Sequence, residues 1–171
     1  KTTLITGPTN LIPPENVNTV RVETADEMFE KTKKILPVDI AICAAAVSDF
    51  KILNYQNKKI KRKDKINLSF KKNIDILSYL SNHNSSRPKL VVGFAAETDN
   101  LINNAQEKIL TKHCDWIIAN DISNKKIGFN SDLNEVSIIY KENKKAEKIS
   151  KRKKSEIAEI ISKKILENFV S

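Results

Sequence analysis

The sequence predicts an α/β fold: a doubly wound, mainly parallel, Rossmann-like sheet with a C-terminal antiparallel hairpin and a final helix. Two observations support this prediction. Short apolar runs alternate along the chain with segments whose apolar residues recur at helical spacing, which is typical of strands alternating with helices. Near the C-terminus, two strand-like runs are separated only by a short polar turn, which is typical of a hairpin.

The N-terminal part predicts two strands and a helix. Residues 4–6 form a short strand ending at Gly7-Pro8, and residues 20–22 form a second strand after a loop. Thr24 and Glu27 have the spacing of a capping box, so the helix begins at Thr24. Its inward face is expected to carry Ala25, Met28, Phe29, Thr32 and Leu36.

The middle of the chain predicts the centre of the sheet. Residues 38–46 are apolar on both faces, as expected of a strand buried in a parallel sheet. Residues 54–65 are basic and have no period, so we expect a mobile loop, and residues 66–70 alternate as a short strand. Asn73 is expected to cap a helix that carries Ile74, Leu77 and Leu80.

The second half predicts two further buried strands, at residues 90–95 and 116–119. Between them, Thr98 or Asp99 caps a helix that runs to about Lys112, with Leu101, Ala105, Ile109 and Leu110 facing inward. The hairpin follows at residues 135–140 and 148–149. The final helix has an apolar stripe of Ile157, Ile160, Ile161, Ile165 and Phe169. No repeat or linker is visible, so residues 1–171 are expected to form a single domain.

The composition limits the possible partners. Lys and Arg number 30 against 21 Asp and Glu, a net charge of +9, which favours phosphate-bearing ligands, nucleic acid or an anionic membrane. We favour plain surface solvation over nucleic-acid binding, because no basic run alternates with aromatic residues. No stretch is apolar enough to span a membrane, and no signal peptide is visible.

The cysteines, histidines and glycines exclude several kinds of site. Cys43 and Cys114 lie far apart beside apolar runs, so reduced, buried thiols in a cytoplasmic protein are expected. His83 and His113 share no ligand spacing with them, so a zinc site is not expected. The three glycines of the chain, Gly7, Gly93 and Gly128, lie too far apart to form a G-x-G-x-x-G phosphate turn.

Polar residues follow three of the buried strands: Val47-Ser48-Asp49, Glu97-Thr98-Asp99 and Asn120-Asp121. The carboxyl ends of parallel strands share one edge, which is where open α/β sheets bind ligands. Each end alone is better explained by the preference of Asp, Asn and Ser for starting loops and capping helices, but three such ends in one chain weaken that explanation. The small residues from Gly93 to Ala96 are expected to let a ligand approach the backbone.

Two groups of basic residues are candidates for binding phosphates. Lys108 and Lys112 lie one turn apart on a predicted helix, although a solvated face is the simpler explanation for such a pair. Lys59, Lys61, Arg62 and Lys63 lie on the basic loop, which either closes over an anionic ligand or has no role.

Five stretches, taken together and in order, resemble the phosphopantothenate–cysteine ligase family, also called phosphopantothenoylcysteine synthetase. In bacteria, this ligase is usually the second half of a bifunctional coenzyme A biosynthesis protein. The stretches are Ala44-Ala45-Ala46-Val47-Ser48-Asp49-Phe50, Lys59-Ile60-Lys61-Arg62, Asn73-Ile74-Asp75-Ile76, Gly93 to Thr98, and Ala119-Asn120-Asp121-Ile122-Ser123 followed by Gly128 to Asp132.

The resemblance implies a reaction and its partners. The family joins 4′-phosphopantothenate to L-cysteine. In its bacterial form, CTP with Mg²⁺ activates the carboxylate as an acyl-cytidylate and releases pyrophosphate, and the cysteine amine then displaces CMP. The resemblance also implies a homodimer and a flavin-dependent decarboxylase domain in the same or a partner chain. No flavin is expected in this chain, and no metal ligands are assigned.

The resemblance also implies site residues. The first lysine of the Lys-Ile-Lys motif, Lys59, is expected to be catalytic, on a flap over the reacting phosphate. The expected nucleotide-binding residues are Asp49, Lys59, Asn73, Ile74, Asp75, Ile76, Phe94, Lys108 and Lys112. Further candidate positions are Ala45, Glu97, Asn120 and Asp121.

The sequence departs from the family pattern at two places. The family begins with an earlier strand, a Gly-rich turn and an Ile-Ser-Asn segment that helps to bind phosphopantothenate, whereas Lys1 to Pro8 resembles the strand that follows them. We therefore expect an N-terminally incomplete ligase domain whose turnover alone is in question. In addition, Asn73-Ile74-Asp75 replaces the usual Asn-Pro-Asp.

Two other functions stay open from the sequence. One is an NAD(P)-dependent oxidoreductase on a Rossmann-like sheet, which binding of NADPH but not CTP would favour. The other is a basic nucleic-acid-binding module, which a steep salt dependence of binding would favour.

Overall fold

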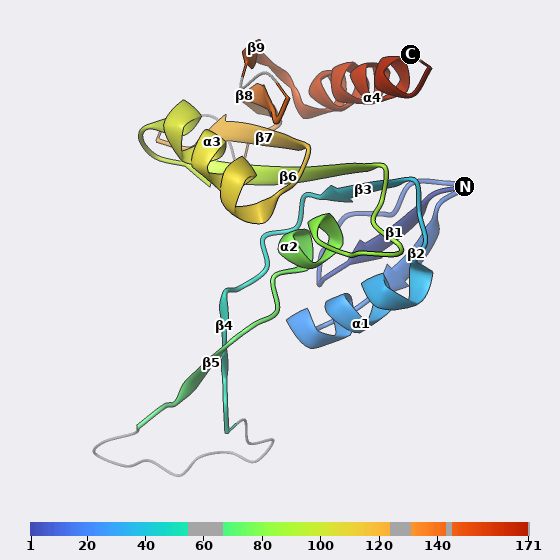
Figure 1. Cartoon of the computed structure of the whole chain (residues 1–171), viewed down its shortest axis with the longest axis vertical. Helices are drawn as coiled ribbons and strands as arrows, with labels where there is room; N and C mark the ends of the chain where they lie inside the picture. Colours follow the sequence, from blue (N-terminus) through green and yellow to red (C-terminus); the bar gives the residue numbers. More distant parts are fainter. Residues whose placement is uncertain (55–66, 124–130, 143–144, 171) are drawn as a thin grey trace.

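The computed structural model describes residues 1–54, 67–123, 131–142 and 145–170. Its centre is a five-stranded mixed sheet in the order β3 (Ile40–Cys43), β6 (Leu90–Glu97), β7 (Trp116–Asp121), β8 (Leu133–Tyr140) and β9 (Ala146–Lys153) (Figure 1). β3, β6 and β7 run parallel, and β8 and β9 form an antiparallel hairpin next to β7. The predicted α/β class and the predicted C-terminal hairpin are confirmed.

A second, two-stranded parallel sheet lies near the N-terminus. It consists of β1 (Thr3–Thr6) and β2 (Asn18–Arg21), and α1 (Ala25–Ile35) packs against β1. Thr24 caps α1 as predicted, because its side chain accepts the Glu27 N–H at 3.1 Å. The reciprocal bond differs from a standard capping box, since the Glu27 carboxylate accepts the N–H of Glu23 at 2.8 Å.

Helices cover both faces of the large sheet. α4 (Lys154–Val170) packs on one face through Ile157, Ile161 and Ile165, which share a buried cluster with Val92, Ile118 and Ile138 of the strands. α2 (Ile76–Ser81) and α3 (Leu101–Lys112) pack on the other face, with Leu80, Ala105 and Ile109 against Val91, Ile117 and Ile139. Successive strand residues therefore alternate between the two layers, as the period of a strand requires.

The strand predicted at residues 38–46 is shorter and more exposed than expected. β3 has four residues and, among the described strands, one hydrogen-bonded neighbour, β6; the Ile42 side chain is 52% exposed. The prediction of burial on both faces is wrong because β3 is an end strand of this sheet, not a central one.

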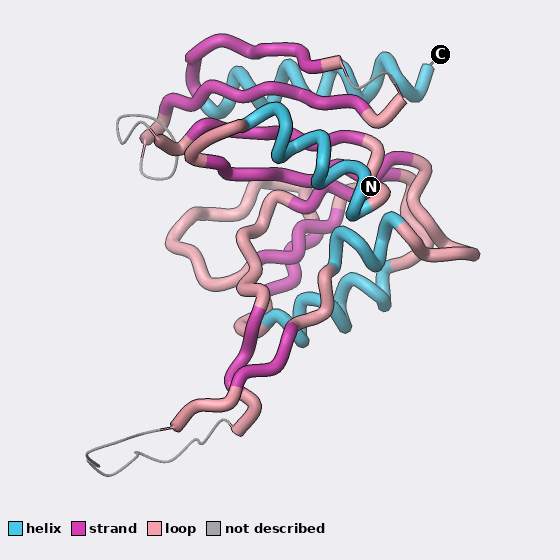
Figure 2. Tube along the Cα trace, turned by 60° about the vertical axis from the view of Figure 1, so that its left-hand side comes forward, coloured by secondary structure: helices cyan, strands magenta, loops and turns pink. Residues whose placement is uncertain are grey.

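A two-stranded antiparallel ribbon projects from the body of the molecule (Figure 2). It pairs β4 (Phe50–Ile52), which the sequence did not predict, with β5 (Phe70–Lys72), which begins where the predicted strand at 66–70 ends. The predicted basic loop at 54–65 lies, apart from Asn54, outside the described residues.

Two helix starts differ from the predictions. Asp75, not Asn73, caps α2, and Ile74 lies before the helix with its side chain 51% exposed. α3 begins after Asn100, which adopts a left-handed conformation at φ 45° and makes no side-chain cap, because β6 extends to Glu97 and the chain must reverse after it. Leu110 is exposed, not inward as predicted. The inward face of α3 carries Leu101, Ala105 and Ile109, which recur every four residues, and Leu110 is one residue off that spacing.

No helix in the described part of the chain has the length and apolar character needed to cross a bilayer.

Candidate functional site

The ends of β6 and β7 bring two of the predicted carboxylates together. Glu97 and Asp121 are register partners, and Ala96 is opposite Asn120. The Asp121 carboxylate accepts the N–H of Ser123 at 2.8 Å, and hydrogen bonding by Ser123 lowers the pKa of that carboxyl. The Glu97 carboxylate accepts a bond from the Asn104 amide at 3.1 Å. This edge of the sheet therefore presents two anionic acceptors, as the sequence predicted.

The start of α2 and the end of α3 are joined by an ion pair. One oxygen of Asp75 accepts the Ser78 N–H at 2.8 Å, and the other pairs with the Lys112 ammonium. Burial alone would raise the pKa of Asp75, but the hydrogen bonds from Lys112 and Ser78 outweigh it and lower that pKa. Two predicted nucleotide-binding residues, 37 positions apart, are thus in direct contact.

The two lysines of α3 differ in their surroundings. Lys112 is bound to Asp75, whereas Lys108, one turn earlier and half-buried, has no ion-pair partner within the described residues. Lys108 therefore carries a positive charge that no described carboxylate pairs with, whereas the charge of Lys112 is shared with Asp75.

Asn73 connects the turn after β3 to the start of α2. Its backbone N–H donates to the Asp49 carbonyl at 2.8 Å, and its side-chain amide donates to the Ser48 carbonyl, also at 2.8 Å. The predicted residues Asp49 and Asn73 are therefore adjacent. Ala45, an additional candidate, lies exposed in the segment between β3 and this turn.

Phe94 does not join this group of side chains. It packs with the apolar cluster that α4 covers, whereas Asp75 and Lys112 belong to the helices on the opposite face of the sheet. Any contribution of the Phe94 side chain to the same ligand therefore comes from the other side of β6.

Gly93 has a structural reason for its missing side chain. A Cβ built there would lie 2.6 Å from Leu77 Cδ2 and 2.8 Å from Ile117 Cδ1. The expectation that Gly93 lets a ligand approach the backbone is wrong, because α2 already fills that space. Ala96, nearer the end of β6, is exposed and still fits that expectation.

Both cysteines are free, as predicted, with Cys114 buried and Cys43 half-buried. Burial raises the pKa of the Cys43 thiol to about 12 and that of the Cys114 thiol to about 11. Both thiols are therefore protonated at neutral pH and lack the lowered pKa of an activated cysteine nucleophile. Among the described residues, no three His, Cys, Asp or Glu side chains are placed to hold a metal ion.

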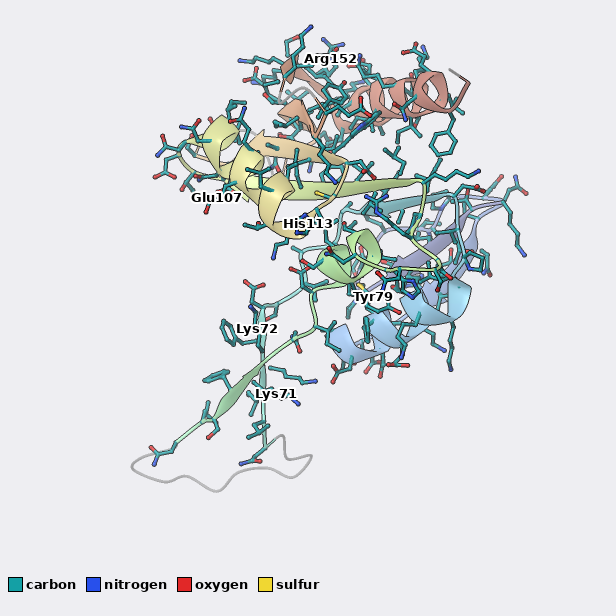
Figure 3. All side chains as sticks on the ribbon, in the orientation of Figure 1. Lys71, Lys72, Tyr79, Glu107, His113 and Arg152 are labelled. Atoms are coloured by element: carbon teal, nitrogen blue, oxygen red, sulfur yellow. The ribbon has the colours of Figure 1, made fainter. Side chains whose placement is uncertain are left out.

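Some predicted residues cannot be placed in this site. Lys59 lies outside the described residues, as do Lys61, Arg62 and Lys63. Lys71 and Lys72 follow these residues in the sequence. They lie on β5 of the ribbon that projects from the body (Figure 3).

Comparison with known proteins decides the family. Residues 1–169 match the family described as DNA/pantothenate metabolism flavoprotein C-terminal domain. The chain belongs to this family. The match confirms the resemblance that the five sequence stretches indicated.

Similar proteins and structures agree with this family. The chain is 43% identical over 166 residues to the "Coenzyme A biosynthesis bifunctional protein CoaBC" of Borreliella burgdorferi, covering 94% of this chain and 40% of that protein. The protein of the same name from Haemophilus influenzae is 37% identical, with 98% and 41% covered. The crystal structure of a CoaBC C-terminal domain is 30% identical, with a TM-score of 0.76, and the match covers 95% of this chain and 71% of that one.

This flavoprotein C-terminal domain spans about two fifths of the length of the relatives above. Most of the candidate site lies in the stretches that carried the resemblance. These include the paired ends of β6 and β7, the turn at Asp49, and Asp75. Lys112, the partner of Asp75, lies on α3, which follows the stretch from Gly93 to Thr98. The Asp75–Lys112 and Asn73–Ser48 contacts were not predicted, because no sequence period relates residues so far apart.

Proposed function

We propose that this chain is the ligase portion of a coenzyme A biosynthesis protein, folded as a single nucleotide-binding domain over residues 1–171. It would join 4′-phosphopantothenate to L-cysteine through an acyl-cytidylate formed from CTP with release of pyrophosphate. The observation that carries the proposal is the family match over residues 1–169, together with relatives at 43% and 37% identity named for coenzyme A biosynthesis.

The charges of the candidate site suit this chemistry. A carboxylate attacking the α-phosphate of a nucleotide brings two anions together, so cations must neutralise the triphosphate and the developing charge. We assign this task to Lys108 and Lys112 on α3 and, by resemblance, to Lys59 as the catalytic lysine. Asp75 already holds Lys112, which would orient its ammonium before the nucleotide arrives.

We propose that Mg²⁺ enters with CTP rather than occupying a protein cage. Mg²⁺ usually keeps several waters and binds through one or two carboxylates and the phosphates of the substrate. Glu97 and Asp121 are the carboxylates at the ends of β6 and β7 that fit this need. When bound, the ion would neutralise phosphate charge next to the lysines. No flavin is expected in this chain.

We also propose a homodimer, supported by the ribbon. Ile52 and Phe70 are cross-strand partners, and Phe50 lies on the same face of the ribbon because it is two residues from Ile52. Phe50 and Phe70 are 58% and 61% exposed. An isolated two-stranded ribbon is marginal in water, so a second copy covering this face would stabilise it. The decarboxylase partner and the cytoplasmic location also stay predictions.

The two alternatives have less support. The oxidoreductase reading lacks the glycine fingerprint, and the relatives above are named for coenzyme A biosynthesis. The nucleic-acid reading rests on the net charge of +9 alone.

Two measurements test the proposal. Calorimetric titration of the chain with CTP–Mg²⁺ is expected to show saturable binding at one site, and NADPH or duplex DNA in its place is expected to show none. In the full-length protein, Lys59→Gln is expected to abolish pyrophosphate release in the presence of phosphopantothenate while the fold is retained. The ligase assignment fails if CTP does not bind, and the role of Lys59 fails if pyrophosphate release continues at the wild-type rate.

A further inference from the structure

We propose that Asn73 is a positioning residue: its side-chain amide holds the Ser48–Asp49 turn against the start of α2 and acts on the nucleotide through Asp49. This inference rests on the proposed function. It assigns Asn73 an indirect role in place of the direct nucleotide contact expected from the sequence.

The contacts of Asn73 close the inner end of the ribbon. In the β4–β5 ladder, Phe50 is opposite Lys72, and the bond from the Asn73 N–H to the Asp49 carbonyl extends this pairing by one residue toward the body. The side-chain amide adds a second bond, to the Ser48 carbonyl at 2.8 Å. The Ser48 hydroxyl in turn donates to the Phe50 carbonyl at 2.8 Å, so the turn is fixed from both sides.

The amide of Asn73 is already committed to this turn. Its Nδ2 donates to Ser48, and its Oδ1 is buried and, within the described residues, has no donor. A buried acceptor without a donor lowers stability, and such local violations are typical of positions kept for function. Because Oδ1 is enclosed, the side chain acts on the backbone around it and not on a ligand in solution.

The same short segment contains Asp75, a second predicted nucleotide-binding residue. Two residues after Asn73, Asp75 caps α2 and pairs with Lys112. The segment from Asn73 to Asp75 therefore sets the Asp49 turn relative to the end of α3. Asp49 itself is exposed, so its carboxylate is accessible to a nucleotide.

The test compares Asn73→Ala with Asn82→Ala by calorimetric titration with CTP–Mg²⁺. Asn82 is the matched control, because its amide also donates to backbone carbonyls, those of Ser78 at 2.7 Å and Lys112 at 3.4 Å, but at the far end of α2. Asn73→Ala is expected to weaken CTP binding about tenfold, the factor that one hydrogen bond of ordinary strength supplies. Asn82→Ala is expected to leave the affinity within about twofold of wild type, although both lower the melting temperature.

Two further variants separate positioning from direct contact. Asn73→Asp keeps the shape but replaces the donor by an oxygen, so it should weaken binding at least as much as Asn73→Ala. In an Asp49→Ala background, Asn73→Ala should have less than about a twofold further effect, because a residue that acts through Asp49 loses its influence with it. Should Asn73→Ala fail to fold, Asn73→Asp, which also lacks the amide donor, takes its place in the same cycle.

The outcomes test the positioning role of Asn73 separately from the proposed ligase function. Absence of CTP binding by the wild-type chain contradicts the ligase proposal and the inference with it. Wild-type binding with equal effects of Asn73→Ala and Asn82→Ala overturns the inference alone, as does full additivity of Asn73→Ala and Asp49→Ala.

Discussion

At the scale of single residues, Gly93 lets the Leu77 side chain of α2 pack closely against β6 because it has no Cβ. Gly93→Ala is expected to lower the free energy of unfolding by about 1–3 kcal/mol, because the new methyl group meets Leu77 and Ile117 side chains at 2.6 and 2.8 Å. Urea unfolding measures this change. Gly7→Ala is the control, since a Cβ there meets nothing within 4 Å and should change stability by less than about 0.5 kcal/mol. Equal losses in the two variants would contradict the packing explanation.

Asp75 makes stability depend on pH. The pKa of its carboxyl is lower in the folded chain than its ordinary value of 3.8, so the contribution is complete above that value and is lost as pH falls through the folded pKa. Asp75→Asn is therefore expected to cost roughly 1 kcal/mol at pH 7, discounted for partial exposure, and progressively less below about pH 4.

Urea midpoints between pH 7 and pH 3 test this expectation. Asp39→Asn is the control, because the Asp39–Lys89 pair is exposed, at 72% and 73%, and should contribute little at any pH. A gap between wild type and Asp75→Asn that stays constant down to pH 3 would show that the ion pair is not the cause.

At the scale of elements, the sequence predicted those whose pattern is long and regular. The stripe of Ile157, Ile161 and Ile165 repeats over several turns and identified α4. Two strand-like runs with a short polar turn between them identified the hairpin. β3 was overestimated because an apolar run does not reveal whether a strand is central or at an edge. The start of α2 was misplaced because Asn73 and Asp75 are both good caps, and only the bond to Ser78 decides between them.

The sequence predicted those parts of the candidate site that depend on sheet topology and missed those that depend on how the helices pack. The polar strand ends Glu97 and Asp121 could be found, because parallel topology brings the carboxyl ends of strands together. The Asp75–Lys112 contact could not, because it depends on how α2 packs against α3. The position of Phe94 on the α4 face follows from the register of β6, which the residues alone do not fix.

Helix α3 carries two lysines that can be separated by experiment. Lys108→Ala is expected to weaken CTP–Mg²⁺ binding about tenfold, the effect of losing one charge-assisted phosphate contact, with little change in stability. Lys112→Ala is expected to weaken binding and also to lower the melting temperature, because it leaves Asp75 without its cation. Calorimetry and thermal unfolding of the two variants measure both quantities. If Lys108→Ala leaves the CTP affinity unchanged, the phosphate-binding role of this helix face is refuted.

At the scale of the whole molecule, stability and proposed assembly reside in different parts. The two apolar layers around the five-stranded sheet contain most of the buried side chains, while the ribbon of β4 and β5 projects beyond them (Figure 1). The Phe50 and Phe70 side chains of the ribbon are exposed. A change in the exposed face of the ribbon should therefore alter association without unfolding the sheet.

Phe70→Asp tests this separation. The wild-type chain is expected to sediment as a dimer and the variant as a monomer, with a dissociation constant raised about a hundredfold. The reason is that a charge replaces an aromatic side chain that is exposed in the single chain and that the proposed dimer would bury. Lys71→Asp is the control: it places the same carboxylate one residue away, on the opposite face of the ribbon, where Lys71 is the cross-strand partner of Lys51.

Analytical ultracentrifugation over a range of concentrations measures association, and near-UV circular dichroism reports whether the packing around Trp116 is intact. A monomeric wild type, or dissociation by Lys71→Asp to the same degree, would exclude the apolar face of the ribbon as the dimer contact. A dimer lost only in Phe70→Asp, with the Trp116 signal unchanged, would locate assembly on the ribbon and stability in the sheet.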